Sequence, residues 1–442
     1  MDNDLQPDRN LRDRNLDWFR SAAPYINAHR NKTFVVAFGG EAVQHANFIH
    51  LIHDIALLNS LGIRLILVHG SRPQINARLA ETHQQSQFAQ GRRISDNAAL
   101  PAITQACGYV RHRIEAALSM GLAQSPMQGA DIKVISGNFL TARPYGVRDG
   151  VDYQLTGEVR KVNTDAIEKV LDHNSISLIS HMGYSPTGEL FNCAWEEVAE
   201  AVSIQINADK LIILDQAQGL FDQHNQLIRE LTTTEAKTLL TNEQHPLPHL
   251  DAAVRACKQG VARCHLLSFE NQDSLLKELF TLDGSGTLLA NESYEKVRQA
   301  TINDVGGLLE LIEPLEEEGL LVRRPRKLLE TEIDQFVVIE RGDAIIGCAA
   351  LYPFANSSSG ELACVAVHPD YRQGKRGDTL LEHIEKRAQT LNVKKLFVLT
   401  TRTSHWFQER GFKPAEPDQL PAQKQKLYNF QRNSKVFLKR LV

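Results

Sequence analysis

Along the first half of the chain, apolar residues occur in two patterns: short continuous runs of strand length, and longer segments with helical spacing. From residue 32 an apolar run of strand length, TFVVAFGG, is followed by a segment with apolar residues at helical spacing, FIHLIHDIALLNSLG, and by a second apolar run, IRLILVHG. Both runs end in glycine, and Gly62 follows the helical segment where a C-terminal cap is expected. This order predicts a β–α–β unit in a parallel sheet buried on both faces, with the strand-end glycines at the ligand-binding edge.

The alternation continues to about residue 289, so we expect one large α/β domain with a parallel sheet over residues 28–289. A polar tail and a short apolar helix interrupted by Pro24 precede it over residues 1–27. Because that helix cannot bury its own face, we expect it to dock on another subunit or over a pocket edge. The other predicted elements are helices over residues 98–120, 196–207 and 248–260, strands over 175–180, 210–215 and 262–268, and a strand-rich region over 131–160.

A second pattern begins after a polar linker over residues 290–296. We expect residues 297–442 to form a second, smaller α+β domain. Its centre is the stretch ELACVAVHPDYRQGKRGDTLLEH, residues 361–383, which predicts a buried strand, a basic loop and an amphipathic helix. Around it we expect a strand and helix from residue 297, a helix over 326–334, a hairpin over 336–354, a strand over 394–400, a helix over 404–412 and strands over 427–430 and 436–441.

Composition is that of a globular protein with more than one core. The 442 residues are 42% hydrophobic and 23% charged, and the net charge of −4 argues against a nucleic-acid partner. The sequence contains no apolar run of membrane-spanning length and begins without an apolar signal core, so we expect a cytoplasmic protein. Six cysteines without a C-x-x-C pair argue against a zinc site or a disulfide framework, and we expect no metal.

The strand, loop and helix of residues 361–383 predict an anion site. A loop that enters a helix aims several backbone N–H groups and the helix dipole at one point. Arg372, Lys375 and Arg376 add positive charge there, so the expected ligand carries phosphate or pyrophosphate. The alternative is an ordinary turn that binds nothing.

These residues resemble the acetyl-CoA site of the GCN5-related N-acetyltransferases (GNAT family). Residues 367–372, VHPDYR, match the turn of that family, and Gly377 holds the last glycine position of its loop, although Lys375 stands where a glycine is usual. A lysine adopts a positive φ less readily than glycine. The resemblance implies acetyl-CoA as co-substrate, bound by Cys364, Val365, Ala366, Val367, Arg372, Gln373, Gly374, Lys375, Arg376, Gly377 and Asp378.

Acetyl transfer to an amine needs a proton acceptor for the amine and a proton donor for the leaving thiolate. Glu361, at the head of the central strand, is the candidate general base, acting through water, and Thr400, at the end of the neighbouring strand, is the candidate acid. The alternative for both is a solvated strand-end side chain. Cys364 has apolar neighbours in sequence, which raise the pKa of a thiol, so we expect it to pack rather than to carry an acyl group.

The first domain resembles the amino-acid kinase fold, in its N-acetylglutamate kinase branch. The shared segments are FGG (38–40), VHG (68–70), RISD (93–96) and NADKL (207–211), in the order of that family. Three departures argue against phosphoryl transfer, which depends on positive charge and N–H groups around the phosphates. Ala37 replaces the phosphate-binding lysine, Ser71 and Arg72 replace glycines, and NCAWE (192–196) replaces an Asn-x-Asn-x-Asp segment.

Residues 279–287, LFTLDGSGT, resemble the signature of arginine-inhibited kinases in that branch, and the N-terminal helix is another feature of the group. The resemblance implies a regulatory L-arginine site. Its contacts would be Tyr25, Lys210, Glu278, Asp283 and Gly286. The alternative is an inert turn.

The order of the two domains, with segments such as HWFQERGF (405–412) and RNSK (432–435), resembles the bacterial two-domain N-acetylglutamate synthase family. The resemblance implies acetyl transfer from acetyl-CoA to L-glutamate, the first step of arginine biosynthesis, feedback inhibition by L-arginine, and a homo-oligomer, for which a hexamer is plausible. Two alternatives stay open: an active amino-acid kinase, and an acetyltransferase of peptide amines with a ligand-sensing domain. The implied glutamate contacts are Arg323, Arg324, Tyr352, Arg432 and Ser434.

Overall fold

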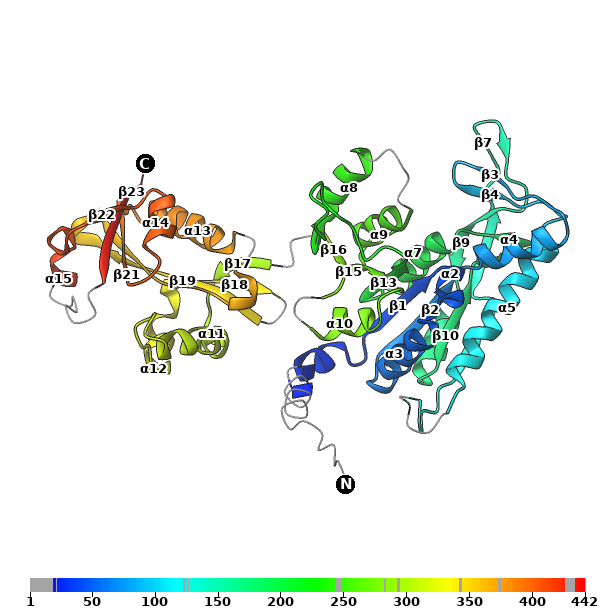
Figure 1. Ribbon diagram of the computed structural model, residues 1–442, viewed down its shortest axis with the longest axis horizontal. Coiled ribbons are helices and arrows are strands. Elements are labelled where there is room, and N and C mark those ends of the chain that lie inside the picture. The colour runs from blue at the N-terminus through cyan, green and yellow to red at the C-terminus, as the bar shows by residue number, and fades with distance from the viewer. Residues whose placement is uncertain are drawn as a thin grey trace, which may run out of the picture. The chain divides into compact units, whose positions relative to one another are not determined.

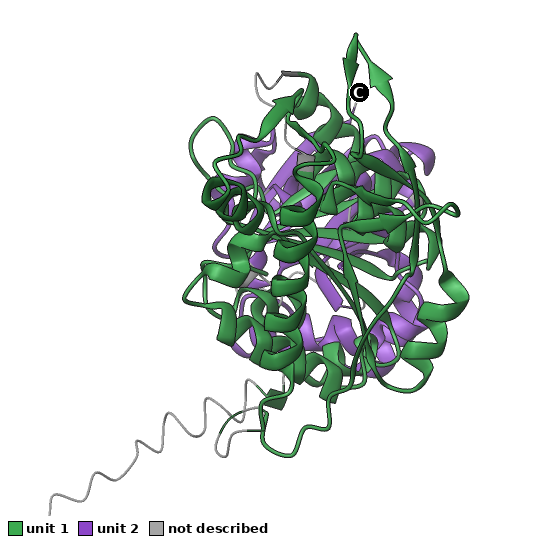
Figure 2. Cartoon of the chain, turned by 90° about the vertical axis from the view of Figure 1, so that its right-hand side faces the viewer, with its two compact units in different colours: residues 1–293 green, residues 294–442 purple. Residues whose placement is uncertain are grey.

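The computed structural model describes residues 19–20, 22–121, 125, 127–242, 248–281, 284–291, 295–341, 344–372, 375–425 and 434–441. The chain forms two compact units, coloured separately in Figure 2: unit 1 is residues 1–293 and unit 2 is residues 294–442. Each unit has its own main sheet and its own hydrophobic clusters. Each is therefore a separate packing unit.

Unit 1 is built on an eight-stranded sheet in which all neighbouring strands are parallel except β15 and β16. Its central strands are almost entirely buried, which explains their continuous apolar runs. In sheet order the strands are β14 (Glu230–Thr232), β16 (Thr287–Ala290), β15 (Arg263–Ser268), β13 (Lys210–Asp215), β1 (Thr33–Phe38), β2 (Arg64–His69), β10 (Ile176–Ser180) and β5 (Val134–Ser136).

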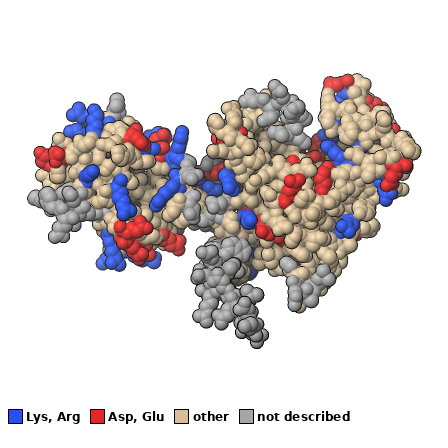
Figure 3. Space-filling view, viewed as in Figure 1, with Lys and Arg blue, Asp and Glu red and all other residues tan. Residues whose placement is uncertain are grey.

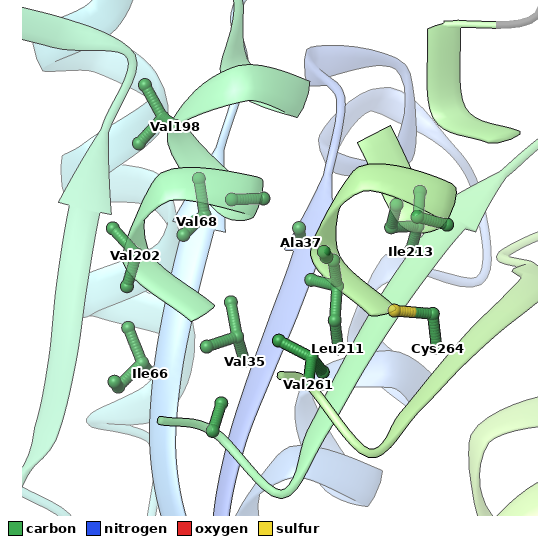
Figure 4. Packing of buried hydrophobic residues seen from close by; sticks show 14 of the residues in the cluster. Val35, Ala37, Ile66, Val68, Val198, Val202, Leu211, Ile213, Val261 and Cys264 are labelled. Carbon is green, nitrogen blue, oxygen red and sulfur yellow. The ribbon is translucent and has the colours of Figure 1, made fainter. Parts of the chain in front are cut away.

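Helices cover both faces of this sheet (Figure 1). Successive residues of β1 point to opposite faces, so Val35 and Ala37 pack beneath α7 (Trp195–Gln205), while Phe34 and Val36 face the other way. Figure 4 shows the first of these clusters, where Val198 and Val202 of α7 lie over the strands. α6 (Thr164–Asp172) and α9 (Pro248–Lys258) share the face of α7, and α3 (Phe48–Ser60), α5 (Leu100–Leu118) and α10 (Ser274–Phe280) cover the other.

The remaining elements of unit 1 surround the carboxyl edge of the sheet and its flanks. A four-stranded sheet has the order β12-β11-β6-β9, and β3 pairs with β4 and β7 with β8. The bounds are α2 (Gly40–Gln44), α4 (Arg72–Glu81), β3 (Gln87–Ala89), β4 (Arg92–Ile94), β6 (Leu140–Pro144), β7 (Val147–Arg148), β8 (Val151–Asp152), β9 (Gly157–Val162), β11 (Met182–Tyr184), β12 (Leu190–Asn192) and α8 (Thr233–Asn242).

The N-terminal helix packs on its own unit. Residues 19, 20 and 22–29 are helical, so the helix continues through Pro24. Ala22, Tyr25 and Ile26 join the cluster of α3 and α10. His29 Nε2 lies 2.9 Å from the Leu279 carbonyl oxygen. The prediction that Pro24 interrupts this helix is therefore wrong. Tyr25 and Ile26 are only half-buried and Phe19 is 60% exposed, so the docking of this helix on another subunit or over a pocket edge stays a prediction.

Unit 2 contains a seven-stranded sheet whose neighbours are antiparallel except for β20 and β21. α11 (Val305–Glu317) and α12 (Arg326–Glu332) cover one face, and α13 (Arg376–Thr390) with α14 (Ser404–Glu409) covers the other. The strands in sheet order are β17 (Glu295–Gln299), β18 (Phe336–Arg341), β19 (Ala344–Phe354), β20 (Ser359–Val367), β21 (Lys395–Thr400), β23 (Lys435–Arg440) and β22 (Lys413–Ala415).

Most predicted elements are present, with ends that differ by a few residues. The predicted helix over residues 98–120 is α5, which runs from Leu100 to Leu118 with Pro101 in its first turn. Seven short strands were not predicted, because each has four residues or fewer and lacks a long apolar run: β3, β4, β11, β12, β14, β16 and β22. The predicted strand over residues 427–430 lies outside the described residues.

Two surface observations bear on possible partners. No helix in the described part of the chain is long and apolar enough to cross a membrane. On the face drawn in Figure 3, Lys and Arg side chains lie among Asp and Glu side chains on both units. The charges on this face are therefore mixed rather than separated by sign.

Candidate functional site

Strands β20 and β21 pair along only part of their length. The parallel register runs from Ser359 opposite Lys395 to Glu361 opposite Phe397. Beyond these pairs β20 continues to Val367 and β21 to Thr400, and these described residues do not pair with one another. Backbone groups on the facing sides of the two strand ends can therefore hydrogen-bond an extended ligand.

A bulge interrupts β20 in the segment that the sequence assigns to acetyl-CoA. The register between β19 and β20 shifts between Cys348 and Ala350, and Cys364 has a φ of 51°. A bulged residue is unpaired and bends its strand. The bulge therefore changes the direction of β20 just before Val365, Ala366 and Val367.

The start of α13 is suited to an anion. Lys375, its N-cap, has φ 61° and ψ 15°, the left-handed conformation that glycine adopts most easily. The helix has 15 residues, and its first N–H groups have no partners within the helix. Gln373 and Gly374 of the same predicted site lie outside the described residues.

The basic side chains of this loop have different surroundings. Arg372 and Lys375 are exposed. Arg376 is half-buried; its Nε lies 3.0 and 2.9 Å from the two carboxylate oxygens of Glu295, and its Nη1 donates to the Tyr371 carbonyl at 2.9 Å. Glu295 thus holds the guanidinium, and the predicted phosphate contact of Arg376 stays a prediction.

Only glycine fits at position 377, because the Trp406 side chain lies very close to its Cα. A Cβ on Gly377 would lie 2.8 Å from Cζ2 of Trp406. The indole cannot move freely, because the Arg410 guanidinium stacks 4.1 Å from its centroid and is itself bound to Asp378 of the same helix turn. Gly377 and Asp378 thus fix the start of α13 against α14.

The conformation of Lys375 predicts that glycine would stabilise this position. We expect Lys375→Gly to stabilise unit 2 by about 0.5 kcal/mol, since relief of the left-handed strain outweighs the entropy that glycine adds to the unfolded chain. The measurement is urea unfolding followed by circular dichroism. Lys375→Ala is the matched control, because alanine keeps the Cβ; an equal gain from alanine would contradict the explanation.

Glu361 and Thr400 lie where the two strands stop pairing. Each is only 8% exposed. Glu361 Oε2 lies 2.7 Å from Nζ of Lys424, in α15 (Ala422–Gln425). Thr400 Oγ1 accepts a hydrogen bond from the Thr403 N–H at 3.1 Å and lies 2.8 Å from the Thr403 hydroxyl. Neither is a solvated strand-end group, and Lys424 was not singled out by the sequence.

Tyr352 and Arg324 lie on the face of the sheet that carries Glu361. Tyr352 pairs directly with Glu361, which places both side chains on one face. The Tyr352 hydroxyl donates to Glu332 Oε2 at 2.6 Å. Burial acts to lower the pKa of Arg324, but nearby Cys364 and Tyr352 raise it above its ordinary value.

No ion pair holds the Arg324 guanidinium among the residues that the structure describes. Its Nη1 donates to the Val322 carbonyl at 2.8 Å, and its backbone N–H donates to Glu316. A half-buried guanidinium without an ion-pair partner can bind the carboxylate of a ligand. The other predicted contacts differ: Arg323 is exposed, Ser434 is buried beside the end of β21, and Arg432 lies outside the described residues.

Cys364 differs from its sequence-based prediction. The pKa of its thiol is lowered, chiefly by the interaction with the Cys348 side chain, and Arg324 acts in the same direction against burial. The prediction of an apolar surrounding that raises the pKa was wrong, because the neighbours that matter come from β19 and from the segment before α12. Cys364 is nevertheless only 5% exposed, as expected for a packing residue.

Two family models match the chain. The amino acid kinase family matches residues 32–268, and the acetyltransferase (GNAT) domain matches residues 332–414. The amino-acid acetyltransferase of Ectopseudomonas mendocina is 55% identical over 430 residues, 96% of this chain and 99% of its own. That of Azotobacter vinelandii is 55% identical over 428 residues, with the same coverage. This chain belongs to the amino-acid acetyltransferases.

Solved structures agree with this assignment. The structure of N-acetylglutamate synthase from Neisseria gonorrhoeae complexed with coenzyme A and L-arginine is 36% identical, with a TM-score of 0.85, and covers 96% of this chain and 99% of its own. A second structure, of the same enzyme with coenzyme A and N-acetyl-glutamate, is 37% identical with a TM-score of 0.62, and covers 97% and 99%. The predicted fold class and the predicted enzyme class are confirmed.

In this acetyltransferase the edge where a kinase binds phosphates is filled. Ala37 is fully buried in the cluster beneath α7 (Figure 4). A Cβ on Gly70 would lie 2.5 Å from Cδ1 of Trp195, so the indole rests directly on this turn. His249 packs 5.2 Å from the indole, and its Nε2 lies 3.3 Å from the Asp215 carboxylate. An indole and a carboxylate thus lie where phosphate binding would require free N–H groups and cations.

The predicted arginine site of unit 1 contains a chain of buried hydrogen bonds. Lys210 Nζ lies 3.3 Å from His265 Nε2, and His265 Nδ1 lies 2.7 Å from Glu278 Oε1. Glu278 Oε2 accepts the N–H groups of Ser285 and Gly286 at 2.6 and 3.0 Å. His265, which the sequence did not suggest, connects the predicted residues. Asp283 lies outside the described residues, and Tyr25 is on the N-terminal helix.

Burial largely determines the protonation states of the residues in this series of hydrogen bonds. Burial and the adjacent Lys210 lower the pKa of His265, so the ring is neutral near pH 7 and donates from Nδ1 to Glu278. Burial, helped by the nearby charge of Arg263, lowers the pKa of Lys210 to about 7, although the Glu278 and Asp209 carboxylates act against this shift. Burial acts to raise the pKa of Glu278, but the hydrogen bonds from His265 and the two backbone N–H groups lower it to about 2.

The low pKa of Glu278 predicts a stability that depends on pH. A carboxyl whose pKa falls from 4.5 to about 2 on folding adds roughly 3 kcal/mol of stability above pH 4.5, and loses it as the pH falls toward 2. We expect Glu278→Gln to destabilise unit 1 by about this amount at neutral pH, and the difference from wild type to shrink in acid. Urea unfolding across pH tests this.

Glu168→Gln is the control for this substitution. Glu168 pairs with Arg64 at the surface, its side chain 41% exposed, so its loss should cost less than about 1 kcal/mol at any pH. A Glu278→Gln penalty that does not change with pH would contradict the role of the ionised carboxylate.

Proposed function

We propose that this acetyltransferase transfers the acetyl group of acetyl-CoA to the α-amine of L-glutamate, giving N-acetyl-L-glutamate and CoA, the first step of arginine biosynthesis. The carrying observation is the convergence of three features in unit 2: unpaired strand ends, a helix start suited to phosphate, and the buried carboxylate of Glu361. The bound ligands of the Neisseria gonorrhoeae relative support this choice.

In this proposal the pantetheine arm lies along residues 364–367 and the pyrophosphate meets the start of α13. The backbone N–H groups of β20 beyond Glu361 polarise the thioester carbonyl. Arg324 binds one carboxylate of the substrate, and Ser434 with Arg432 binds the other. Since L-glutamate carries two carboxylates, cationic groups from separate elements match it.

The chemical step is direct attack within a ternary complex. Glu361 accepts a proton of the α-ammonium group through water, so that the amine can attack the thioester carbon. The C–N bond forms and the C–S bond breaks, and Thr400 gives its hydroxyl proton to the leaving thiolate. The second proton of the nitrogen returns to the Thr400 oxygen, and Glu361 gives its proton to solvent, so both groups are regenerated and one proton is released per turnover.

We also infer that L-arginine is a feedback inhibitor bound by unit 1. The support is the buried chain from Lys210 through His265 to Glu278, which fixes the glycine-rich turn at Gly286. L-arginine is a ligand of the Neisseria gonorrhoeae enzyme. A homo-oligomer, with the hexamer as the form to test, and a cytoplasmic location complete the proposal.

The test is free thiol release from acetyl-CoA with L-glutamate, with and without L-arginine, with ATP consumption measured in parallel. Glutamate-dependent release that arginine suppresses, without ATP use, is the expected result. Release with peptide amines but not with glutamate would overturn the substrate assignment. ATP consumption with N-acetylglutamate would overturn the argument from Ala37 and Trp195.

A further inference from the structure

Lys424 reaches the proposed general base from a distant part of the chain. Its Nζ lies 2.7 Å from Glu361 Oε2, and the two side chains are 23% and 11% exposed. Within the described residues Lys424 is the only polar partner of the Glu361 carboxylate, so Oε1 has none of its own there. The pair therefore leaves one oxygen of a mostly buried carboxylate available to a water molecule or an amine.

The segment that carries Lys424 is anchored rather than loose. Leu420 is 4% exposed and packs with Phe397, the residue of β21 that lies opposite Glu361. Gln425 Nε2 donates to the carbonyls of Asp418 and Leu420, both at 2.7 Å. The short α15 is thus attached to β21 on one side and presents Lys424 to β20 on the other.

We propose that Lys424 is a positioning residue for acetyl transfer: it fixes the Glu361 carboxylate and directs Oε1 to the amine. The inference rests on the proposed function of Glu361. A cation beside a mostly buried carboxylate favours the charged form, which is the form that accepts a proton. The ion pair between Lys424 and Oε2 also fixes the rotation of the carboxylate group, so Oε1 points in a single direction.

The test compares pH profiles of kcat/KM for the full-length protein. We expect Lys424→Met to lower kcat about tenfold and to move the acid limb of the profile to higher pH by about one unit, because the carboxylate loses its cation. Lys424→Arg keeps the charge and should retain the acid limb of wild type. In a Glu361→Gln background, Lys424→Met should have no further effect on kcat.

Lys439→Met is the matched control. Lys439 Nζ pairs with Glu385 at 2.5 Å in the same unit, and these side chains are 24% and 22% exposed, but the pair lies on β23 and α13. Its loss should leave the pH profile unchanged. Circular dichroism of each variant separates a loss of fold from a loss of positioning, and Lys424→Arg keeps the test decisive if Lys424→Met unfolds.

Two results would overturn the inference. A Lys424→Met variant with the acid limb and kcat of wild type would show that the ion pair does not act on the base. A raised KM for L-glutamate with an unmoved acid limb would assign Lys424 to substrate binding instead. Both results require that the wild-type protein is active. If the wild-type protein showed no glutamate-dependent thiol release, the proposed function itself would be overturned.

Discussion

Glu361→Gln is expected to lower kcat about a hundredfold to ten-thousandfold while leaving the KM for acetyl-CoA near its wild-type value. Glutamine has nearly the shape of glutamate but cannot accept the proton of the α-ammonium group. The carboxylate is 8% exposed, so bulk water cannot easily replace it as base. Steady-state thiol release at saturating acetyl-CoA and varied L-glutamate measures the effect.

The control for this prediction is Glu385→Gln, which removes another half-buried Glu–Lys pair of unit 2 without touching the proposed site. It should retain wild-type kcat. If Glu361→Gln kept more than a tenth of the wild-type kcat, the base would have to be another group, and Glu361 would be assigned a packing role instead.

Gly377→Val is expected to raise the KM for acetyl-CoA about tenfold to a hundredfold. A Cβ at this position would lie 2.8 Å from Cζ2 of Trp406, well inside normal contact. Arg410 clamps the indole from the other side, so the start of α13 must shift instead. Overpacking of this kind costs about 1–3 kcal/mol, and here the cost appears in the binding of the pyrophosphate.

Gly306→Val is the matched control, because Gly306 also lies in the first turn of a helix, α11, and a Cβ there meets nothing within 4 Å. It should leave the KM for acetyl-CoA unchanged. Isothermal titration of CoA into both variants isolates binding from chemistry. Equal affinities for CoA would contradict the assignment of the α13 start to the pyrophosphate.

The sequence predicts those parts of the site that follow one another along the chain. The strand before Val367, the loop through Arg372 and Lys375, and the amphipathic helix after Gly377 are local patterns, and the structure contains each of them. The left-handed conformation of Lys375 could also be anticipated, because a glycine is usual there in the family.

The sequence does not predict contacts between segments far apart in the chain. Lys424 meets Glu361 across more than sixty residues, and no local pattern marks it. The charge of Arg376 predicts an anion site equally well whether its partner is a phosphate or Glu295, and only packing decides between them. The same holds for Cys364, whose thiol responds to Cys348 on the neighbouring strand.

Trp195 and Trp406 give each unit an internal optical reporter. The protein has three tryptophans, and Trp18 lies outside the described residues. Trp195 is 9% exposed on the filled edge of unit 1, beside His249, while Trp406 lies against Gly377 at the proposed pyrophosphate site. The fluorescence emission of a chain lacking Trp406 therefore follows unit 1 alone, and that of a chain lacking both Trp18 and Trp195 follows unit 2 alone. Quenching by added CoA is expected only in a chain that retains Trp406.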